Sequence, residues 1–263
     1  MTEEIIMADF TKTDSLYINE NTIPYYCNTN AHLIEGEVKG FVLEFPGLGG
    51  GSCMGGCMDQ GDYNGNLPSI LASHGILQVY TFPGPWSWMN KGAVRMVNAL
   101  VKALRKKYNL TEKTPWAVMG GSMGGMGALM YSANCNVNED SVGVPGRCVA
   151  VCPCVNIPDV MHRVQDIPRT VFRAVSDYDM PIEDGLKLIS PNCRTADMPH
   201  IPYLVVCDCA DEIIPEEHIN DYVADLKSRG HNVTHDHLPG AGHGAITDDE
   251  WCKIIEFLLE EFR

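Results

Sequence analysis

One serine stands in a glycine-rich segment, VMGGSMGGMGAL at residues 118–129, which follows an apolar run. Residues 120–124 match the pattern G-x-S-x-G, in which a sharp turn from a strand into a helix presents the serine hydroxyl as a nucleophile. Small residues two positions before and after the serine are required, because bulkier side chains would collide across the strained turn. The segment therefore predicts that Ser122 is a nucleophile and that the backbone N–H of Met123 donates to a developing oxyanion.

Glycines in such a turn also serve phosphate binding, and two patterns describe that use. A P-loop has Gly-Lys-Ser/Thr after a first glycine and four spacers. Counted from Gly120, these positions hold Gly125, Met126 and Gly127, so the lysine that would reach the phosphates is missing. The dinucleotide pattern G-x-G-x-x-G fails in every register. A contact between small residues of packed helices, without chemistry, stays open as an alternative.

The elements that must position this serine follow from the hydrophobic pattern. Apolar runs of strand length alternate with longer helical patterns, which predicts a mostly parallel sheet with crossover helices, an α/β fold. Helices are predicted over residues 93–108 and from about residue 248, where apolar residues repeat with a period of 3.6. Strands are predicted at residues 40–45, 76–82, 116–120, 148–155, 203–209 and 232–238.

From about residue 40 to its C-terminus, the chain resembles the α/β-hydrolase superfamily, whose members carry a nucleophile, an acid and a histidine in that order. The turn with Ser122 matches the first of these. In the segment CADEIIPEEH the resemblance identifies Asp211 as the acid, with Asp208 and Glu212 as weaker alternatives. The segment PGAGHGAI, between the last strand and the last helix, supplies His243. The resemblance thus implies a catalytic triad of Ser122, Asp211 and His243.

The same resemblance places an oxyanion turn after the first strong strand, where the sequence is EFPGLGGG. By the superfamily's pattern the second oxyanion donor is the backbone N–H of Leu48, with Gly49 as the alternative. Relatives usually have histidine and glycine where this chain has Pro46 and Gly47, so the shape of the turn stays open.

Large apolar side chains follow the predicted turns and are candidates for the substrate pocket. Met54 and Met58 come after the oxyanion turn, and Trp86 and Trp88 come after the next strand. An indole ring offers apolar area and one hydrogen-bond donor, which suits an acyl or a sugar group. Packing explains the two tryptophans equally well.

Residues 156–199 interrupt the regular alternation, since some forty residues separate two predicted strands. Helix starts of the Asp-x-Pro kind follow Asp166 and Asp179. We interpret this stretch as a lid-like helical insertion within a single domain that spans residues 1–263. A helical insertion that plays no part in substrate binding is an equally good interpretation.

Cysteine and histidine side chains are the residues of this chain that could bind a transition metal. The chain has 11 cysteines, but no two Cys pairs have the spacing of a zinc site. The pairs Cys152 with Cys154 and Cys207 with Cys209 stand in apolar runs, where cysteine usually acts as a small buried hydrophobe. His235 and His237 share one face of a predicted strand, and an exposed face is the favoured interpretation. We therefore expect no metal ion and no cofactor.

The charge of the chain limits its partners. A formal net charge of -15, from 34 Asp and Glu against 19 Lys and Arg, argues against nucleic acid or an anionic membrane surface. No stretch reaches the roughly 18 unbroken apolar residues of a membrane span, and no secretory signal is recognised at the N-terminus. We expect a cytoplasmic protein, for which a homo-oligomer remains open.

The resemblance implies a serine hydrolase, and within the superfamily the residues around DEIIP are most similar to prolyl-oligopeptidase-like hydrolases and their esterase relatives. About forty residues precede the first core strand, too few for a propeller that restricts entry to peptides. This favours a small carboxylic ester, such as an acylated carbohydrate, as substrate. The alternatives are a small serine peptidase or aminopeptidase, and a protein of this fold that binds a ligand without turnover.

Overall fold

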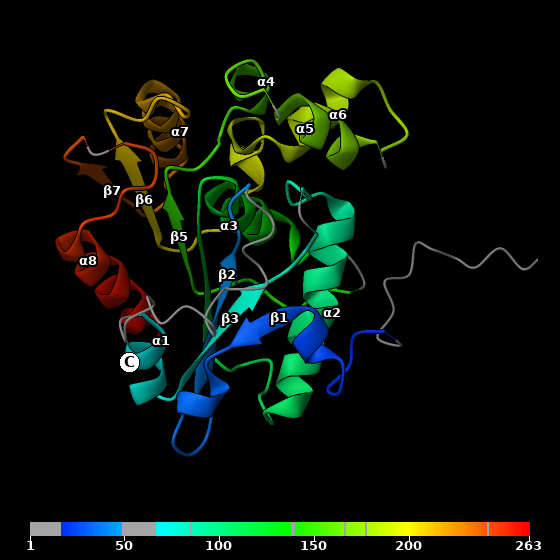
Figure 1. The fold of residues 1–263 in the computed structure, drawn as a ribbon, viewed down its shortest axis with the longest axis vertical. Coiled ribbons are helices and arrows are strands. Elements are labelled where there is room, and N and C mark those ends of the chain that lie inside the picture. The colour runs from blue at the N-terminus through cyan, green and yellow to red at the C-terminus, as the bar shows by residue number, and fades with distance from the viewer. Residues whose placement is uncertain are drawn as a thin grey trace, which may run out of the picture.

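The computed structural model describes residues 17–48, 67–84, 86–137, 140–165, 167–176, 178–240 and 242–263. At its centre these residues form a seven-stranded sheet in the order β1-β3-β2-β4-β5-β6-β7 (Figure 1). Strand β1 runs antiparallel to β3, and the other neighbouring strands are parallel. The mostly parallel sheet predicted from the sequence is confirmed.

The strands lie close to their predicted positions, with two differences. Residues 152–155 were predicted to continue a strand, but β5 ends at Val151 because Cys152 has a φ of 42° and turns the chain away. Strand β1 was not predicted, since three residues are too few to show an alternation. The strands are β1 (Cys27–Thr29), β2 (Gly40–Phe45), β3 (Ile76–Thr81), β4 (Trp116–Gly121), β5 (Arg147–Val151), β6 (Tyr203–Asp208) and β7 (Val233–Leu238).

Helices cover both faces of the sheet. Apolar residues of α1 and α8 pack on one face, and those of α2, α3 and α7 pack on the other. Within the described ranges, no helix combines the length and the apolar character needed to cross a membrane. The α-helices are α1 (Leu67–Ser73), α2 (Lys91–Lys107), α3 (Met123–Asn134), α4 (Ile157–Val160), α5 (Ile167–Val175), α6 (Ile182–Ile189), α7 (Glu216–Ser228) and α8 (Asp248–Leu259).

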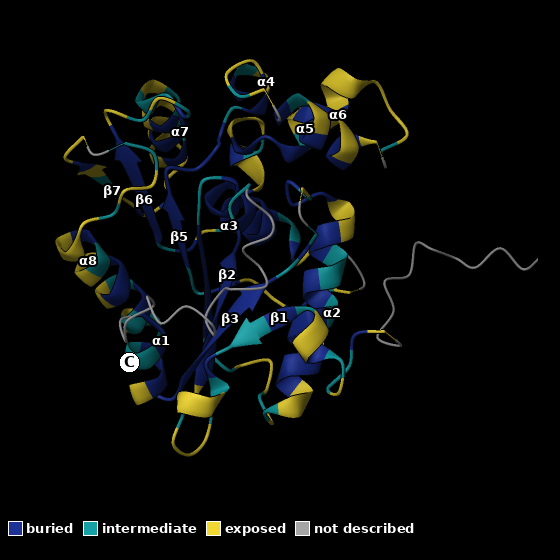
Figure 2. Ribbon diagram, viewed as in Figure 1, coloured by how far each residue is buried: buried dark blue, intermediate teal, exposed yellow. Residues whose placement is uncertain are grey.

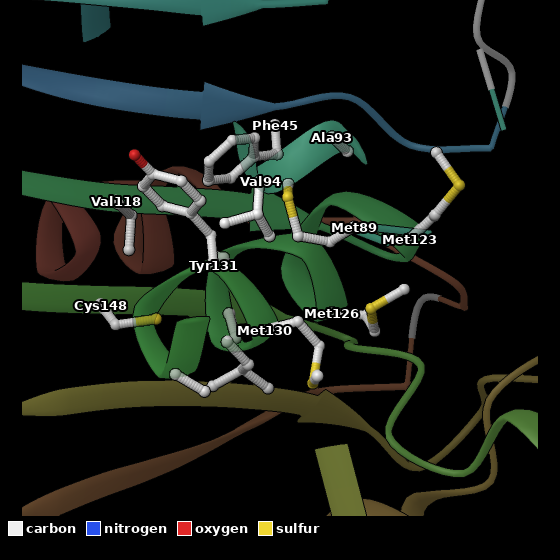
Figure 3. Packing of buried hydrophobic residues seen from close by; sticks show 14 of the residues in the cluster. Phe45, Met89, Ala93, Val94, Val118, Met123, Met126, Met130, Tyr131 and Cys148 are labelled. Atoms are coloured by element: carbon white, nitrogen blue, oxygen red, sulfur yellow. The ribbon is translucent and has the colours of Figure 1, made fainter. Parts of the chain in front are cut away.

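Helix α3 is the central helix of the fold and is buried at nearly every position. Figure 3 shows its residues Met126, Met130 and Tyr131 among the side chains of the main apolar cluster. The ring of Tyr131 lies 5.4 Å from that of Phe45 in β2. Its hydroxyl donates to Asn98 Oδ1 of α2 at 2.8 Å, so this buried polar group is satisfied. The surroundings fix the position of α3, which begins directly after Ser122.

The insertion at residues 156–199 is helical and contains α4, α5 and α6, which lie beyond the carboxyl ends of the strands (Figure 1). Two hydrogen bonds tie α5 to the loop before α2: Trp88 Nε1 donates to Thr170 Oγ1 at 3.0 Å, and Asn90 Nδ2 donates to the carbonyl of Ala174 at 2.8 Å. Figure 2 shows buried strands in the centre and exposed residues on the outer side of α6. The insertion is therefore fixed to the rest of the chain by buried polar contacts.

The first turn of α3 lies against the backbone of β2 so closely that a side chain at Gly124 has no room. An added Cβ would lie 2.0 Å from the carbonyl oxygen of Phe45. Gly124→Ala is therefore expected to lower the free energy of unfolding by about 2–3 kcal/mol, the cost of strong overpacking. Denaturation in urea measures this change.

Gly127→Ala is the matched control on the same helix, since its Cβ would lie 3.4 Å from the nearest atom, Met89 Cε. Alanine favours the helix by about 1 kcal/mol relative to glycine, so this variant should be neutral or more stable. Equal decreases in the free energy of unfolding of the two variants would show that the contact between Gly124 and β2 does not exclude a side chain at position 124.

Candidate active site

The predicted site residues stand on segments that follow four parallel strands. Leu48 comes after β2, Ser122 after β4, Asp211 after β6 and His243 after β7. Because the carboxyl ends of parallel strands meet at one edge of the sheet, these segments converge there. Helices α4 and α5 lie over the same edge (Figure 1).

Ser122 occupies a strained turn between β4 and α3. Its backbone has φ 56° and ψ -124°, a conformation that residues with a Cβ rarely adopt. The N–H of Ser122 donates to the carbonyl of Val151 at 2.8 Å, which holds the turn against β5. A Cβ on Gly120 would lie 2.4 Å from the backbone of Gly124, so both glycines are needed for the chain to turn here. The surrounding backbone thus stabilises the strained serine.

His243 lies between the serine and an aspartate. Its Nε2 is 2.8 Å from Ser122 Oγ, and its Nδ1 is 2.7 Å from Asp211 Oδ2. Gly242 and Gly244 on either side have φ values of 102° and 71°, which residues other than glycine rarely adopt. An ionised carboxylate can only accept hydrogen bonds, so Nδ1 carries the proton and Nε2 is free to accept from the serine hydroxyl.

Asp211 is held as an ionised acceptor. Its side chain is 1 % exposed, and its Oδ1 accepts from the N–H groups of Ile213 at 2.9 Å and Ile214 at 2.8 Å. Burial raises the pKa of Asp211, but the hydrogen bonds from His243, Ile214 and Ile213 outweigh it, so the pKa lies below its usual value. The carboxylate is therefore charged at neutral pH and holds the imidazole in one orientation.

Asp208 and Glu212, the alternative acids, have other surroundings. Asp208 is buried and accepts from the N–H of Ala210 at 2.7 Å and from that of Gly242 at 3.3 Å. Glu212 is exposed. Asp208 thus links the loop after β6 to the loop that carries His243. One sign of this role is visible in the sequence, where an acidic residue ends an otherwise apolar strand.

The two oxyanion donors proposed from the sequence lie on the same cavity as the serine. Met123 is the first residue of α3, so its N–H has no acceptor within the helix. Leu48 and Met123 both line the cavity in front of Ser122. Gly124 lies close to the backbone of Phe45 and Pro46, so the turn after β2 is next to the start of α3. The alternative donor, Gly49, lies outside the described residues.

The cavity in front of Ser122 has a volume of about 270 Å³ and a mostly apolar lining. Three of its apolar wall residues come from the insertion at residues 156–199, and the turn after Asp211 supplies two more. Sequence reasoning missed these residues, because nothing in the chain indicates which side of the insertion faces the serine. The apolar lining includes Trp88, Val160, Val164, Ile167, Ile213 and Ile214.

The structure separates the two tryptophans that were predicted to form the pocket. Trp88 is buried, donates to Thr170 and lines the cavity. Trp86 does not line it and is instead 39 % exposed, in a separate groove beside Arg173. The guanidinium of Arg169 lies 5.3 Å from the Trp86 ring centre. Trp86 is thus not among the described residues that line this cavity, and its role as a pocket residue stays a prediction. Met54 and Met58 lie outside the described residues.

Among the described residues, two groups of side chains have the geometry to hold a metal ion. The first joins Cys152 to Asp211 and His243, whose facing atoms already form a hydrogen bond. Burial raises the pKa of the Cys152 thiol to about 12, so this sulfur is protonated at neutral pH. The second group consists of Cys207 on β6 with His235 and His237 on β7.

Comparisons with known proteins define the fold. No family model matches the chain, and no curated protein matches it in sequence. A truncated carbohydrate esterase from gut microbiota aligns with a TM-score of 0.65 and 16% identity over 87% of both chains. A study of two fungal esterases from Rhizomucor miehei gives a second match, with a TM-score of 0.62 and 15% identity over 86% of this chain and 75% of the other.

An acylaminoacyl peptidase from Pyrococcus horikoshii also aligns, with a TM-score of 0.61 and 12% identity. This match covers 86% of the present chain and 38% of the peptidase. The sheet order and these likenesses show that the chain has the α/β-hydrolase fold, as the sequence resemblance predicted.

Asp211 should make the stability of the fold depend on pH. Its pKa in the folded chain lies below the unfolded value of about 3.9, so its charge stabilises the fold above that pH. This contribution is lost as the pH falls through the lower folded pKa. The difference in unfolding free energy between the wild type and Asp211→Asn should therefore be constant near neutral pH and shrink below about pH 4.

Urea denaturation at a series of pH values measures this difference. The control is Asp179→Asn, which removes an exposed carboxylate, and its difference from the wild type should vary little with pH. A difference for Asp211→Asn that grows on acidification would contradict the direction of the pKa shift.

Proposed function

We propose that this chain is a serine hydrolase that cleaves small carboxylic esters through an acyl-enzyme on Ser122. The observation that carries the proposal is the continuous series of hydrogen-bond distances from Asp211 Oδ2 through His243 to Ser122 Oγ, 2.7 and 2.8 Å long. This series ends at an apolar cavity. The order of the three residues along the chain also agrees with the fold.

In the first step, His243 Nε2 accepts the proton of Ser122 Oγ while the oxygen attacks the ester carbonyl. Asp211 stabilises the imidazolium that forms, and its hydrogen bond to Nδ1 keeps Nε2 directed at the serine. The carbon–oxygen bond to the alcohol then breaks, and His243 donates its proton to the leaving alkoxide. Ser122 is left as an acyl ester.

The negative charge on the carbonyl oxygen needs donors at the time of attack. We assign this role to the backbone N–H groups of Met123 and Leu48, which belong to residues on the same cavity. Water then attacks the acyl-enzyme, with His243 as the base, and releases the carboxylic acid. The proton taken from water returns to Ser122, so the enzyme is regenerated.

The chemistry of the cavity supports an uncharged acyl group as its occupant. Its walls are aliphatic and aromatic, with Trp88 on one side and the insertion on the other. No aspartate or glutamate is among the described residues that line it, so a charged amino terminus would be buried there without a partner. This favours an ester, such as an acylated carbohydrate, over an aminopeptidase substrate. The likeness to an acylaminoacyl peptidase keeps a peptidase as the second candidate.

A ligand-binding protein without turnover is the third candidate, and the complete arrangement of serine, histidine and aspartate argues against it.

For the location of the protein, the nine described cysteines are all free, which supports a reducing compartment such as the cytoplasm. The substrate proposed is a small molecule, and neither nucleic acid nor a membrane surface is proposed as a partner.

Labelling with a fluorophosphonate probe tests the nucleophile. Ser122→Ala should abolish labelling and lower ester turnover by at least about a thousandfold, because no other group replaces the attacking oxygen. The control is Ser132→Ala on the same helix, whose hydroxyl donates to the carbonyl of Ala128. This control should be labelled like the wild type. Undiminished labelling of Ser122→Ala would disprove the assignment.

A panel of substrates distinguishes the two hydrolase candidates. Short-chain aryl esters should have a higher kcat/KM than aminoacyl arylamides, because the apolar cavity offers an amino group no carboxylate among its described residues. Faster cleavage of the arylamides would favour the peptidase. A pure protein that binds both kinds of compound and forms no acyl-enzyme would instead indicate a binding function.

A further inference from the structure

Three side chains with metal-binding atoms meet near the carboxyl ends of β6 and β7, and a fourth, Glu216, contacts two of them. Cys207 stands near the end of β6, and His235 and His237 stand on the neighbouring strand β7. In the parallel register Cys207 is paired with His237, so their side chains share a face. Glu216, the first residue of α7, reaches the same point from above that face. Two strands and one helix therefore contribute to this cluster.

The donor atoms of the cluster lie close together. Cys207 Sγ is 3.3 Å from His235 Nε2 and 3.2 Å from His237 Nδ1. Glu216 Oε1 is 2.7 Å from His237 Nδ1 and 3.7 Å from Cys207 Sγ. Cys207 is buried, His235 is half-buried and His237 is exposed, so the cluster reaches from the core to solvent.

These separations are close to those in a tetrahedral site. Zinc bonds of about 2.3 Å to sulfur and 2.0 Å to nitrogen place neighbouring ligand atoms about 3.3–3.6 Å apart. Three distances of the cluster agree with these ligand-to-ligand separations to within about 0.3 Å. They are the two sulfur–nitrogen distances and the sulfur–oxygen distance. The oxygen of Glu216 would have to move away from His237 by roughly 0.6 Å, which one side-chain rotation achieves.

We propose that Cys207, His235, His237 and Glu216 form a binding site for a divalent transition-metal ion of the zinc class. A thiolate, two imidazoles and a carboxylate form a donor set that suits zinc or cobalt rather than magnesium or calcium. Binding forms a metal–sulfur bond and releases the thiol proton of Cys207 to solvent. This proposal departs from the sequence prediction of no metal and does not depend on the proposed function.

Protonation affects two of the proposed ligands in opposite directions, since His235 is free to bind a metal and Cys207 must first lose its proton. Burial lowers the pKa of His235, and the neighbouring His237 and Lys227 lower it further, so this imidazole is neutral and can bind a metal. Burial raises the pKa of Cys207 to about 12, and the nearby Glu216 adds to this effect. The bound cation itself compensates the proton that Cys207 loses, and the nearby carboxylates of Glu216 and Asp236 favour the positive charge of the ion.

A bound ion would cross-link the two segments that lead to Asp211 and His243. Glu216 begins α7 a few residues after Asp211, and His237 is the penultimate residue of β7, which precedes the loop with His243. The ion would therefore fix α7 and β7 to β6. Its role is structural, because all four ligands come from the protein and a structural zinc site has no open position.

Titration of the metal-free full chain with Co²⁺ tests the site. One equivalent should bind and produce the sulfur-to-cobalt charge-transfer absorption of a thiolate ligand, and Zn²⁺ should displace it. His237→Gln, at an exposed position, should weaken Co²⁺ binding by more than about tenfold, since even changes around a ligand cost that much. Cys207→Ser should abolish the sulfur band. His200→Gln, an exposed histidine outside the cluster, is the control and should bind like the wild type.

Thermal unfolding with and without Zn²⁺ gives a second measurement. Zn²⁺ should raise the Tm of the wild type and of His200→Gln, but not that of His237→Gln. Because His237 is exposed, that variant should fold without metal, as circular dichroism can show. Loss of the cobalt band in Cys152→Ser rather than in Cys207→Ser would place the ion beside Asp211 and overturn the proposal. Absence of binding, or unchanged binding by His237→Gln, would also overturn it.

Discussion

The arrangement of the site depends on a backbone contact between the first turn of α3 and the end of β2. Gly124 lies so near Phe45 that no side chain fits between them, and Gly120 approaches Gly124 in the same way. These contacts set the direction in which α3 leaves the sheet and force Ser122 into its strained conformation. They also bring the turn with Leu48 beside the start of α3. The glycines thus determine both the position of the hydroxyl and the place of the oxyanion donors.

The other half of the site depends on links between loops. Asp208 accepts hydrogen bonds from the loop that carries Asp211 and from Gly242, beside His243. The insertion is linked in the same manner, through Trp88 and Thr170. A fold becomes less stable when a buried polar group is left without its hydrogen-bond partner, so contacts of this kind favour one arrangement of the loops. The cavity is therefore shaped by loops that contact each other, in addition to the sheet beneath them.

Much of this fold could be predicted from the sequence, because buried parallel strands are nearly continuous apolar runs. The turn with Ser122 was recognised from its glycines, and the structure brings Asp211 and His243 to it at hydrogen-bond distance. Apart from these three residues, contacts between distant segments could not be predicted. Nothing in the sequence separates Trp86 from Trp88, because the difference comes from the position of α5.

The cluster around Cys207 illustrates the same limit. The two histidines were seen to share a face of a strand, but their neighbour on β6 depends on the strand order and the register. The sequence places Cys207 in an apolar run, and an apolar run says nothing about which strand lies beside it. A pattern read along the chain therefore finds elements and turns, whereas pairs across strands need the topology.

Strand β7 is the outermost strand of the sheet beyond β6, and this affects how copies of the chain can meet. An outer strand leaves backbone N–H and carbonyl groups available to a strand from another molecule. In β7 the residues are largely polar, and Asp236 is paired with Lys253 of α8 at 3.3 Å. Charged side chains at such an edge oppose the addition of a further strand. The sequence of β7 thus opposes the addition of a further strand at this edge of the sheet.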